Sequence, residues 1–262
     1  MTVLRHELHF ADAGEAADLA AFLARLIHYD RAAAVRLQAG GGVLAVFGRP
    51  PSFEVLAIRT ARLEAVVTAG ATDAGAPGGP GALDTTVSAG QFADALDEAG
   101  SGRTASGGLT VGVPDAVTGP SWAGVLPPRG GWRRVPGLPG TDEVRGSVAA
   151  AVAEFRARDE ALPEEHRTRA ERDRIGHEIW SRTLGDTGLP LRAVHAAQSL
   201  GFLRPVAAGA PAATGSRGAT ALAPAAEPPA LLAAGGWLRL RTPYGSIAVR
   251  TSGLPGLSVT PA

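Results

Sequence analysis

A β-hairpin pattern near the C-terminus, GGWLRLRTPYGSIAVR at residues 235–250, limits the possible architectures more than any other part of the sequence. Apolar and polar residues alternate on both sides of a TPYG turn, which is typical of two strands with one buried side. A two-stranded hairpin is only marginally stable alone in water, so its apolar side must pack against another element. The residues expected to face inward are Leu238, Leu240, Ile247 and Val249.

A β-α-β-β-β pattern at the N-terminus predicts a sheet that the hairpin could join. Residues 2–10 form the first strand-like run, and Asp12 is a suitable N-cap for a helix, with Glu15 placed to reach back to the cap. The apolar residues of this helix fall on one stripe, as expected for a helix with one buried face. Three further extended runs lie at residues 33–38, 43–47 and 53–63.

The same order of elements begins again in the middle of the chain. A strand-like run at 84–88, a helix at 89–98 and a strand at 109–113 are followed by a Pro- and Gly-rich segment that contains Trp122 and Trp132. This second copy lacks its last strands. We therefore expect the hairpin to complete the sheet beside residues 109–113, and the alternative is a hairpin packed solely on helices.

Three helices are predicted between residues 141 and 204. Thr141 is a suitable N-cap for the first, whose apolar residues recur at helical spacing. Pro163 fits the first position of a second, mostly charged helix, and Pro190 starts a short third helix. The LGF sequence around Gly201 is typical of a helix that ends at glycine and is followed by an apolar residue.

These patterns predict an α+β fold in which two βαβββ-like units form a mainly antiparallel sheet core, a C-terminal β-hairpin completes the sheet, and a helical segment is inserted. We expect a sheet domain at residues 1–140 with a loop at 69–83, a helical insertion or subdomain at 141–204, an Ala/Pro-rich linker at 205–230 and the hairpin unit at 231–262. Chain entropy outweighs the little apolar burial that Gly/Pro/Ala-rich stretches offer, so these are expected to be loops. They lie at residues 69–82, 100–108 and 205–229.

Two successive β-α-β-β-β units resemble the domains of DNA sliding clamps, in which the helices line a hole around the duplex. The resemblance covers residues 2–113 and 235–250 and rests on topology, with no diagnostic motif. Helices that face DNA need basic side chains, because the duplex presents its phosphates. The exposed positions expected on the two helices are mostly acidic, so a non-sliding binding role fits the resemblance better. They are Glu15, Asp18 and Arg25 on the first helix, and Asp94, Asp97 and Glu98 on the second.

The overall charge and the missing residue types exclude several classes of protein. The 25 basic and 25 acidic side chains give a formal net charge of zero, which argues against a protein that coats nucleic acid or an anionic membrane. The chain has no Cys, which excludes disulfides and thiolate chemistry, and no Lys, which excludes a Walker A lysine or a Schiff base. The sequence shows neither a leader pattern nor a long apolar run. We expect a cytoplasmic protein without membrane association and without a cofactor.

Sequence patterns for an enzyme are weak. The HEIWS sequence begins like the HExxH zinc motif, but Ser181 stands where the second ligand is needed. His166, Asp173 and His177 could share one helix face, although an ion pair between Asp173 and His177 on a solvated helix explains the same spacing. We therefore expect no metal site and no catalytic residues, and a hydrolase with an unrecognised site is the third hypothesis for function.

A DNA-associated regulator is the second hypothesis. A helix, a GDTG turn, a helix and a later hairpin follow the order of a winged helix-turn-helix. Residues 205–262 contain four Arg and one Glu, whereas residues 141–204 contain ten Arg and eleven acidic residues, which predicts a self-paired surface. The candidate contacts are Arg192, His195 and Gln198 on the third helix and Trp237, Arg239, Arg241 and Arg250 on the hairpin.

A non-enzymatic binding, regulatory or scaffold role through contacts with a protein partner is the first hypothesis. Trp and Arg are enriched at protein interfaces, and the hairpin places Trp237, Arg239 and Arg241 on one side, with Arg250 beside them. Trp122 and Trp132 are expected to plug the core beneath an irregular loop. The sequence leaves the partner and the oligomeric state open.

Overall fold

The computed structural model describes residues 5–69, 82–101, 109–205 and 227–251. Most of each stretch that the sequence predicts as a loop, at 69–82, 100–108 and 205–229, lies outside these residues. The described residues form ten strands in a single antiparallel sheet together with five α-helices, which confirms the predicted α+β fold.

The strands pair in the order β5-β2-β3-β4-β10-β9-β8-β7, and β1 pairs with β4 and with β6. In the N-terminal part of the chain the strands are β1 (Arg5–Phe10), β2 (Ala34–Gly40), β3 (Val43–Gly48), β4 (Leu56–Ala69), β5 (Leu83–Ser88) and β6 (Leu109–Gly112). The C-terminal part supplies β7 (Arg133–Val135), β8 (Ala230–Ala234), β9 (Trp237–Thr242) and β10 (Gly245–Arg250).

The C-terminal hairpin joins the sheet at β4, so the prediction that it lies beside residues 109–113 is wrong. Ser246 pairs with Ile58 and Ala248 with Leu56, all in antiparallel register. The physical reason is the length of β4, which has 14 residues. Its far half pairs with β1, while the same edge of its first residues is left for β10. In the described part of the chain β6 pairs only with β1.

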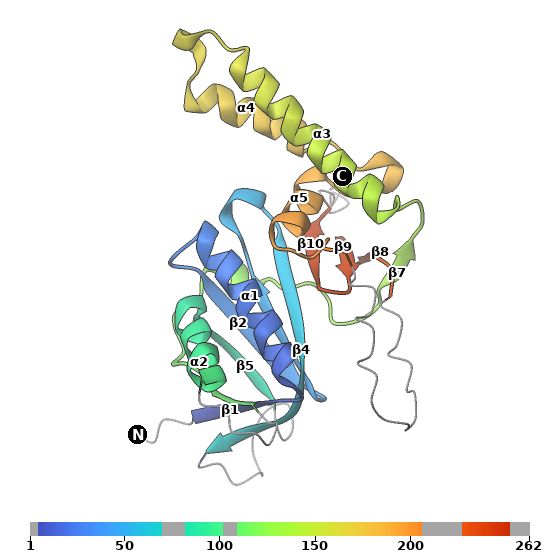
Figure 1. Cartoon of the computed structure of the whole chain (residues 1–262). Helices are drawn as coiled ribbons and strands as arrows, with labels where there is room; N and C mark the ends of the chain where they lie inside the picture. The colour runs from blue at the N-terminus through green and yellow to red at the C-terminus, as the bar shows by residue number, and fades with distance from the viewer. Residues whose placement is uncertain (1–4, 70–81, 102–108, 206–226, 252–262) are drawn as a thin grey trace, which may run out of the picture.

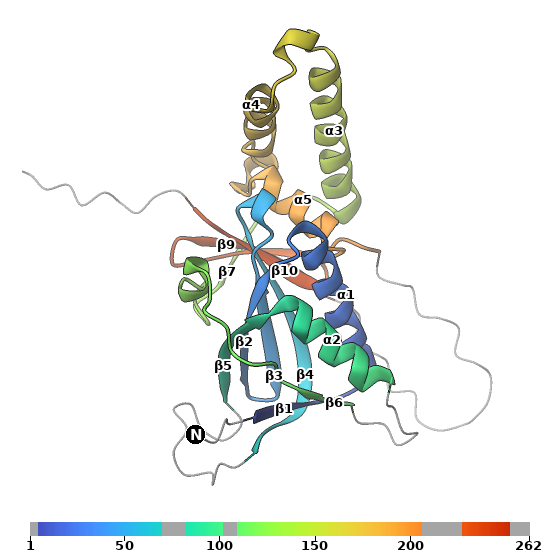
Figure 2. The same ribbon diagram turned by 90° about the vertical axis from the view of Figure 1, so that its left-hand side faces the viewer.

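Two helices, α1 (Ala13–Tyr29) and α2 (Ala89–Ser101), lie side by side on one face of the N-terminal strands (Figures 1 and 2). Asp12 caps α1 as predicted, because its carboxylate accepts a hydrogen bond of 3.0 Å from the backbone N–H of Glu15. The Glu15 side chain does not reach back to the cap. It binds Arg62 of β4 instead, at 2.8 Å.

The C-terminal helices form a projecting arm and its base. The arm consists of α3 (Thr141–Glu160) and α4 (Arg169–Trp180), which extend together away from the sheet (Figure 2). At its base, α5 (Leu191–Ser199) packs against both arm helices and β10. The glycine turn after α5 forms as predicted. Gly201 has φ of 76°, and the N–H of Phe202 donates to the carbonyl of Ala197 at 2.7 Å.

Two of the predicted helix starts in the arm are wrong. Gly140 is the N-cap of α3, and Thr141 is the first helical residue. Pro163 precedes a short 3₁₀ turn rather than α4, which begins later because the Thr168 hydroxyl accepts the N–H of Glu171. Pro190 is the N-cap of α5.

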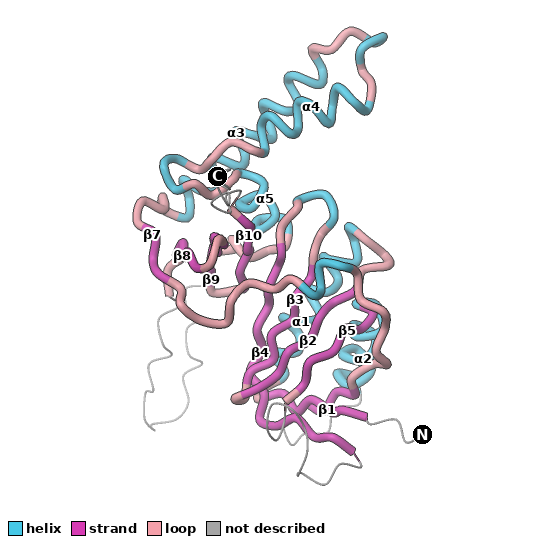
Figure 3. The backbone as a smooth tube through the Cα atoms, turned by 180° about the vertical axis from the view of Figure 1, so that it is seen from behind, coloured by secondary structure: helices cyan, strands magenta, loops and turns pink. Residues whose placement is uncertain are grey.

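The helices α1, α2 and α5 pack on one side of the sheet, which we call the helix face, and the opposite side is the open face. Residues 113–132, here named the strap, cross the open face in front of the strands in Figure 3. Two hydrogen bonds fix the strap there, from the N–H of Val117 to the Thr86 carbonyl (2.9 Å) and from Arg36 to the Ala123 carbonyl (2.8 Å). No helix in the described residues is long and apolar enough to cross a bilayer.

Candidate binding groove on the open face of the sheet

The hairpin divides its side chains between the two faces as its alternation predicts. Leu238, Leu240, Ile247 and Val249 are buried in the main core on the helix face. Trp237 lies on the open face with Ala248, in a second apolar cluster that the strap covers. The strap contributes Trp122, Leu126 and Trp132 to this cluster, and the sheet contributes Phe47, Leu56 and Ile58. The two strap tryptophans therefore plug the structure beneath an irregular segment, as expected.

Two hollows remain on the open face, and different parts of the strap border them. The first, which we name the Trp237 hollow, has a volume of about 460 Å³. Its apolar floor is formed by Leu56, Trp237 and Ala248, and the strap adds Trp122 and Val125. Trp237 is only 9% exposed, so the aromatic part of this floor is held in place by its neighbours.

Three arginines surround the Trp237 hollow. The Arg250 guanidinium lies 5.4 Å from the centre of the Trp237 ring, in cation–π geometry. Arg192 approaches Glu54 at 3.9 Å, and its buried Nε atom has no hydrogen-bond partner. Arg49 is exposed, and neither it nor Arg250 forms an ion pair with a described residue. Within the described residues, Glu54 is thus the one acid that offsets these three positive charges.

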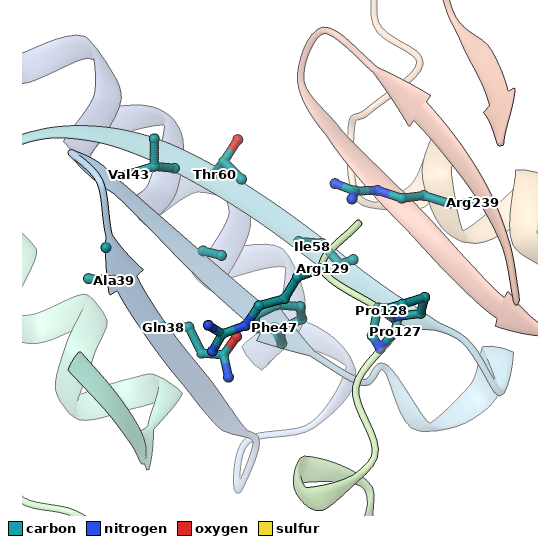
Figure 4. A pocket seen from close by; sticks show the side chains of 12 residues that line it. Gln38, Ala39, Val43, Phe47, Ile58, Thr60, Pro127, Pro128, Arg129 and Arg239 are labelled. Carbon is teal, nitrogen blue, oxygen red and sulfur yellow. The ribbon is translucent and has the colours of Figure 1, made fainter. Parts of the chain in front are cut away.

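The second hollow, named the Arg239 hollow, has a volume of about 350 Å³ (Figure 4). Val43, Phe47 and Ile58 form much of its floor, and Pro127 and Pro128 of the strap form a wall. Arg239 reaches into it from β9, as Figure 4 shows. The remaining lining residues are Gln38, Ala39, Gly40, Ala45, Thr60 and Arg129.

Arg239 is partly enclosed by its neighbours. Its Nη2 donates to the Ser246 hydroxyl at 3.0 Å, and its guanidinium lies 5.7 Å from the centre of the Trp132 ring. The Nε atom is buried without a hydrogen-bond partner. Burial, and then the positive charge of Arg241, lower the pKa of Arg239.

The other predicted contact residues do not line either of the two hollows. Arg241 is exposed and forms an ion pair with Glu227. Gln198 is exposed on α5, whereas the His195 ring is half-buried and stacked on Trp180 at a centroid distance of 4.3 Å. Burial lowers the pKa of His195. Of the three predicted residues on α5, only Arg192 therefore lines the Trp237 hollow.

The helix α5 is enclosed on most of its circumference, which differs from an exposed recognition helix. It packs on β10, on α3 and on the turn at residues 51–53. A recognition helix must present several side chains to a DNA groove. The five buried residues of α5 are Leu191, Ala193, Val194, Ala196 and Ala197.

The candidate metal residues on α4 are also separated by their contacts. Asp173 lies 3.6 Å from Arg169, so the ion pair expected between Asp173 and His177 is replaced by this one. His177 borders a cleft between the arm and the turn at residues 51–54. Within the described residues, no three His, Asp or Glu side chains are close enough to hold a metal ion.

Sequence reasoning missed several groove residues, chiefly Arg49, Arg129, Phe47 and Ile58. The last two follow the alternation of their strands, which places them opposite the core residues. The missing information was that the strap returns over this face. The proline-rich segment with two tryptophans was the available signal, because large aromatic residues in an irregular segment need a surface to cover.

Comparison with protein families divides the chain into two parts. Residues 4–124 match a domain of unknown function, DUF8010, and residues 127–254 match a second domain of unknown function, DUF8185. No curated protein and no solved structure matches the chain. The two matched parts meet within the strap, yet the pairing of β4 with β10 joins their strands in one sheet. Both hollows are lined by residues from the two parts.

Proposed function

We propose that the protein is a non-enzymatic binding module that takes up an acidic, aromatic-containing segment of a protein partner in the Trp237 hollow. The observation that carries this proposal is the excess of arginine around an apolar floor. Arg49, Arg192 and Arg250 surround the hollow, and Glu54 is the one acid that the described residues place beside them.

Charge complementarity identifies the partner segment as acidic. Guanidinium groups without an acidic neighbour bind carboxylates through charge-assisted hydrogen bonds. Arg250 is held against the Trp237 ring, which reduces the side-chain entropy lost when a ligand binds. An acidic segment would neutralise the local excess without a need for long-range attraction, in keeping with the zero net charge of the chain.

The floor of the hollow supports a protein ligand. Tryptophan and arginine are the residue types most enriched at the energetic centre of protein interfaces, where apolar contacts exclude water. Trp237 and Trp122 supply aromatic surface, and Leu56 and Val125 supply aliphatic surface. An aromatic side chain of the partner would pack on these residues, while neighbouring acidic side chains would reach the arginines at the rim.

The DNA-associated alternative has less support from the geometry. Of the proposed DNA contacts, Arg241 is paired with Glu227, and His195 is half-buried and stacked on Trp180. Many charges of the arm are also paired, as in the bidentate contact of Arg158 with Glu178 at 2.8 Å. A single DNA-binding face would require such side chains to be free and adjacent.

The test is a binding measurement with matched peptides. Fluorescently labelled peptides that contain one tryptophan and several glutamates are compared with otherwise identical peptides in which glutamine replaces each glutamate. We expect the acidic peptides to bind at least about tenfold more tightly, a difference of about 1.4 kcal/mol. The double variant Arg49→Ala with Arg250→Ala should remove this preference. Arg174→Ala, an exposed arginine of the arm, is the matched control and should preserve it.

Two results would count against the proposal. Equal binding of the acidic and glutamine peptides would show that the arginines do not select charge. Tighter binding of an oligodeoxythymidine or a mixed-sequence duplex than of any acidic peptide, weakened by the same double variant, would favour the DNA-associated alternative.

A further inference from the structure

Arg239 is a partly buried cation without an acidic partner in the described residues. It forms no ion pair, and its hydrogen bond goes to the neutral hydroxyl of Ser246. The carboxylate of Asp84, which lies at the Gln38 side of the hollow, is already bound by Arg36 at 2.8 Å and by Gln38 at 3.1 Å. Arg239 therefore has unused hydrogen-bonding capacity next to a cavity (Figure 4).

A buried arginine elsewhere in the same sheet shows the usual arrangement. Arg59 is 7% exposed, and it donates to the carboxylate of Asp18 at 2.8 Å and to the backbone carbonyl of Tyr244 at 2.5 Å. Removal of a charge from water is costly unless a partner of opposite charge and further hydrogen bonds compensate for it. The Arg239 guanidinium is partly removed from water and, among the described residues, has no carboxylate to compensate for this desolvation. The cavity beside it has room for a ligand that carries one.

The chemistry of the hollow specifies the partner. A guanidinium group presents a planar fork of N–H donors that matches a carboxylate in a bidentate manner. The floor beside it is largely apolar, formed by Val43, Phe47 and Ile58 with Thr60 and Gln38 at its border, and the wall is formed by the rings of Pro127 and Pro128. The volume of about 350 Å³ is at the lower end of the range for small-molecule sites.

We infer that the Arg239 hollow is a binding site for a single carboxylate carried on a flat or apolar body, with Arg239 as the residue that binds the carboxylate. The carboxylate can belong to a free small organic acid or to the C-terminus of a peptide. Arg129 of the strap also lines the hollow, but its charge acts on the nearby carboxylate of Asp84, whereas Arg239 has no acidic neighbour among the described residues. A single carboxylate bound by Arg239 therefore fits better than a phosphate group. This site is separate from the Trp237 hollow and does not depend on the function proposed for it.

Trp132 provides a local reporter for the test. Its ring lies beside Arg239, and its indole N–H donates to the carbonyl of Pro128 at 3.0 Å. The indole N–H resonance can be assigned by its loss in Trp132→Phe and followed by ¹H–¹⁵N NMR while sodium benzoate is added to the full chain. Benzamide, which has the same ring without the charge, is the matched ligand control.

We expect a saturable shift of the Trp132 resonance with benzoate and an affinity for benzamide at least about tenfold weaker. Arg239→Met, and also Arg239→Gln, should abolish the benzoate response. Arg241→Met removes the neighbouring arginine, which is already paired with Glu227, and should preserve it. A response to benzamide equal to that with benzoate, or one that persists in both Arg239 variants, would overturn the inference. A stronger response to inorganic phosphate than to benzoate at equal ionic strength would also overturn it.

A second pair of probes distinguishes the sources of the carboxylate. N-acetylphenylalanine carries the C-terminal carboxylate of a peptide. N-acetylphenylalaninamide, in which a neutral carboxamide replaces this carboxylate, is its control. Tighter binding of N-acetylphenylalanine than of benzoate supports a peptide C-terminus as the ligand, and the reverse order supports a free small acid. If neither acid binds better than its amide, the hollow does not recognise a carboxylate. Loss of this response in Arg239→Met together with intact binding of acidic peptides at the Trp237 hollow would separate the two proposals.

Discussion

Two pairs of arginines, one on each face of the sheet, differ in their partners. On the helix face, Arg59 and Arg204 both bind the carboxylate of Asp18, at 2.8 and 2.9 Å, and Arg204 also stacks on Tyr244. On the open face, Arg239 and Arg250 contact tryptophan rings and form no ion pair with a described residue. The helix face therefore uses these arginines to hold the two halves of the chain together. On the open face Arg36 and Arg241 are paired with Asp84 and Glu227, but Arg239 and Arg250 remain available for a ligand.

Aromatic residues of the two faces also differ, because Phe22 on the helix face is enclosed in the core and Trp122 of the strap borders a hollow. We expect this difference to give the largest difference in stability. Phe22 is 1% exposed and stacks on Phe202 at 5.7 Å, a contact between α1 and the segment after α5. Phe22→Ala should lower the free energy of unfolding by about 3–5 kcal/mol, because it leaves a cavity in the core. Trp122→Ala, on the strap, should lower it by less than about 2 kcal/mol, because solvent can enter the space. Urea denaturation measures both, and equal losses would remove the distinction between the faces.

The ion pairs of the helix face predict the next effect. Asp18→Asn should lower the free energy of unfolding by about 2 kcal/mol, because Arg59 would remain buried without a carboxylate. Asp18 is partly exposed, so the expected loss is smaller than for a fully buried pair. Asp142→Asn is the matched control, since its pair with Arg145 is at the surface, and it should leave the unfolding midpoint unchanged. The interpretation fails if both variants unfold at the wild-type urea concentration.

Arg239→Met should change the free energy of unfolding in the opposite direction. The substitution removes a partly buried charge that has no acidic partner and retains an unbranched apolar chain beside Trp132. Replacement of such charges by apolar residues is often neutral or stabilising, so we expect a change between zero and about 1 kcal/mol of added stability. A loss as large as that of Asp18→Asn would show that Arg239 stabilises the fold rather than serving a ligand.

The arm provides the smallest effect, through pH. A bidentate hydrogen bond from Arg158, opposed by partial desolvation and aided by the charges of Arg182 and Arg174, lowers the pKa of Glu178 from 4.5 to about 2. A carboxylate with a lowered folded-state pKa stabilises the folded state above its ordinary pKa, and this contribution is lost as the pH falls from 4.5 towards 2. The helical circular dichroism of Glu178→Gln should therefore depend less on pH in this range than that of wild type.

Glu165→Gln is the control for this pH effect, because Glu165 lies at the exposed turn between the arm helices and forms no ion pair with a described residue. Its acid titration should follow that of wild type. Identical titrations for Glu178→Gln and wild type would show that the ion pairs of the arm contribute nothing to its stability. Many surface ion pairs have no measurable effect on stability.

Several local features of the fold were predicted from the sequence, although the helix starts at Thr141 and Pro163 were not. The alternation in the hairpin separated Leu238 and Leu240 from Trp237, and the Asp12 cap and the turn at Gly201 formed as expected. Each of these depends on residues close together in the chain, so a short pattern contains the necessary information.

The long-range features could not be predicted from such patterns. The hairpin pairs with β4 because β4 is longer than the part of it that pairs with β1. The alternation of apolar and polar residues does not determine the length of a strand. The partners of arginine are equally remote, since Asp18 is 41 residues from Arg59 and 186 from Arg204. The two hollows arise only where the strap returns over the sheet, which places Trp122 and Pro127 beside residues of distant strands.

The arginine side chains themselves can be observed while each ligand binds. In a protein labelled with ¹⁵N-arginine, the Nε–H resonances of Arg239 and Arg250 can be assigned by substitution and followed as the acidic tryptophan peptide and benzoate are added. We predict that Arg250 shifts with the peptide and Arg239 with benzoate, while Arg59 and Arg204 stay unchanged. Shifts of Arg59 and Arg204 as large as those on the open face, or no shift at Arg239 and Arg250, would contradict the assignment of binding to the open face.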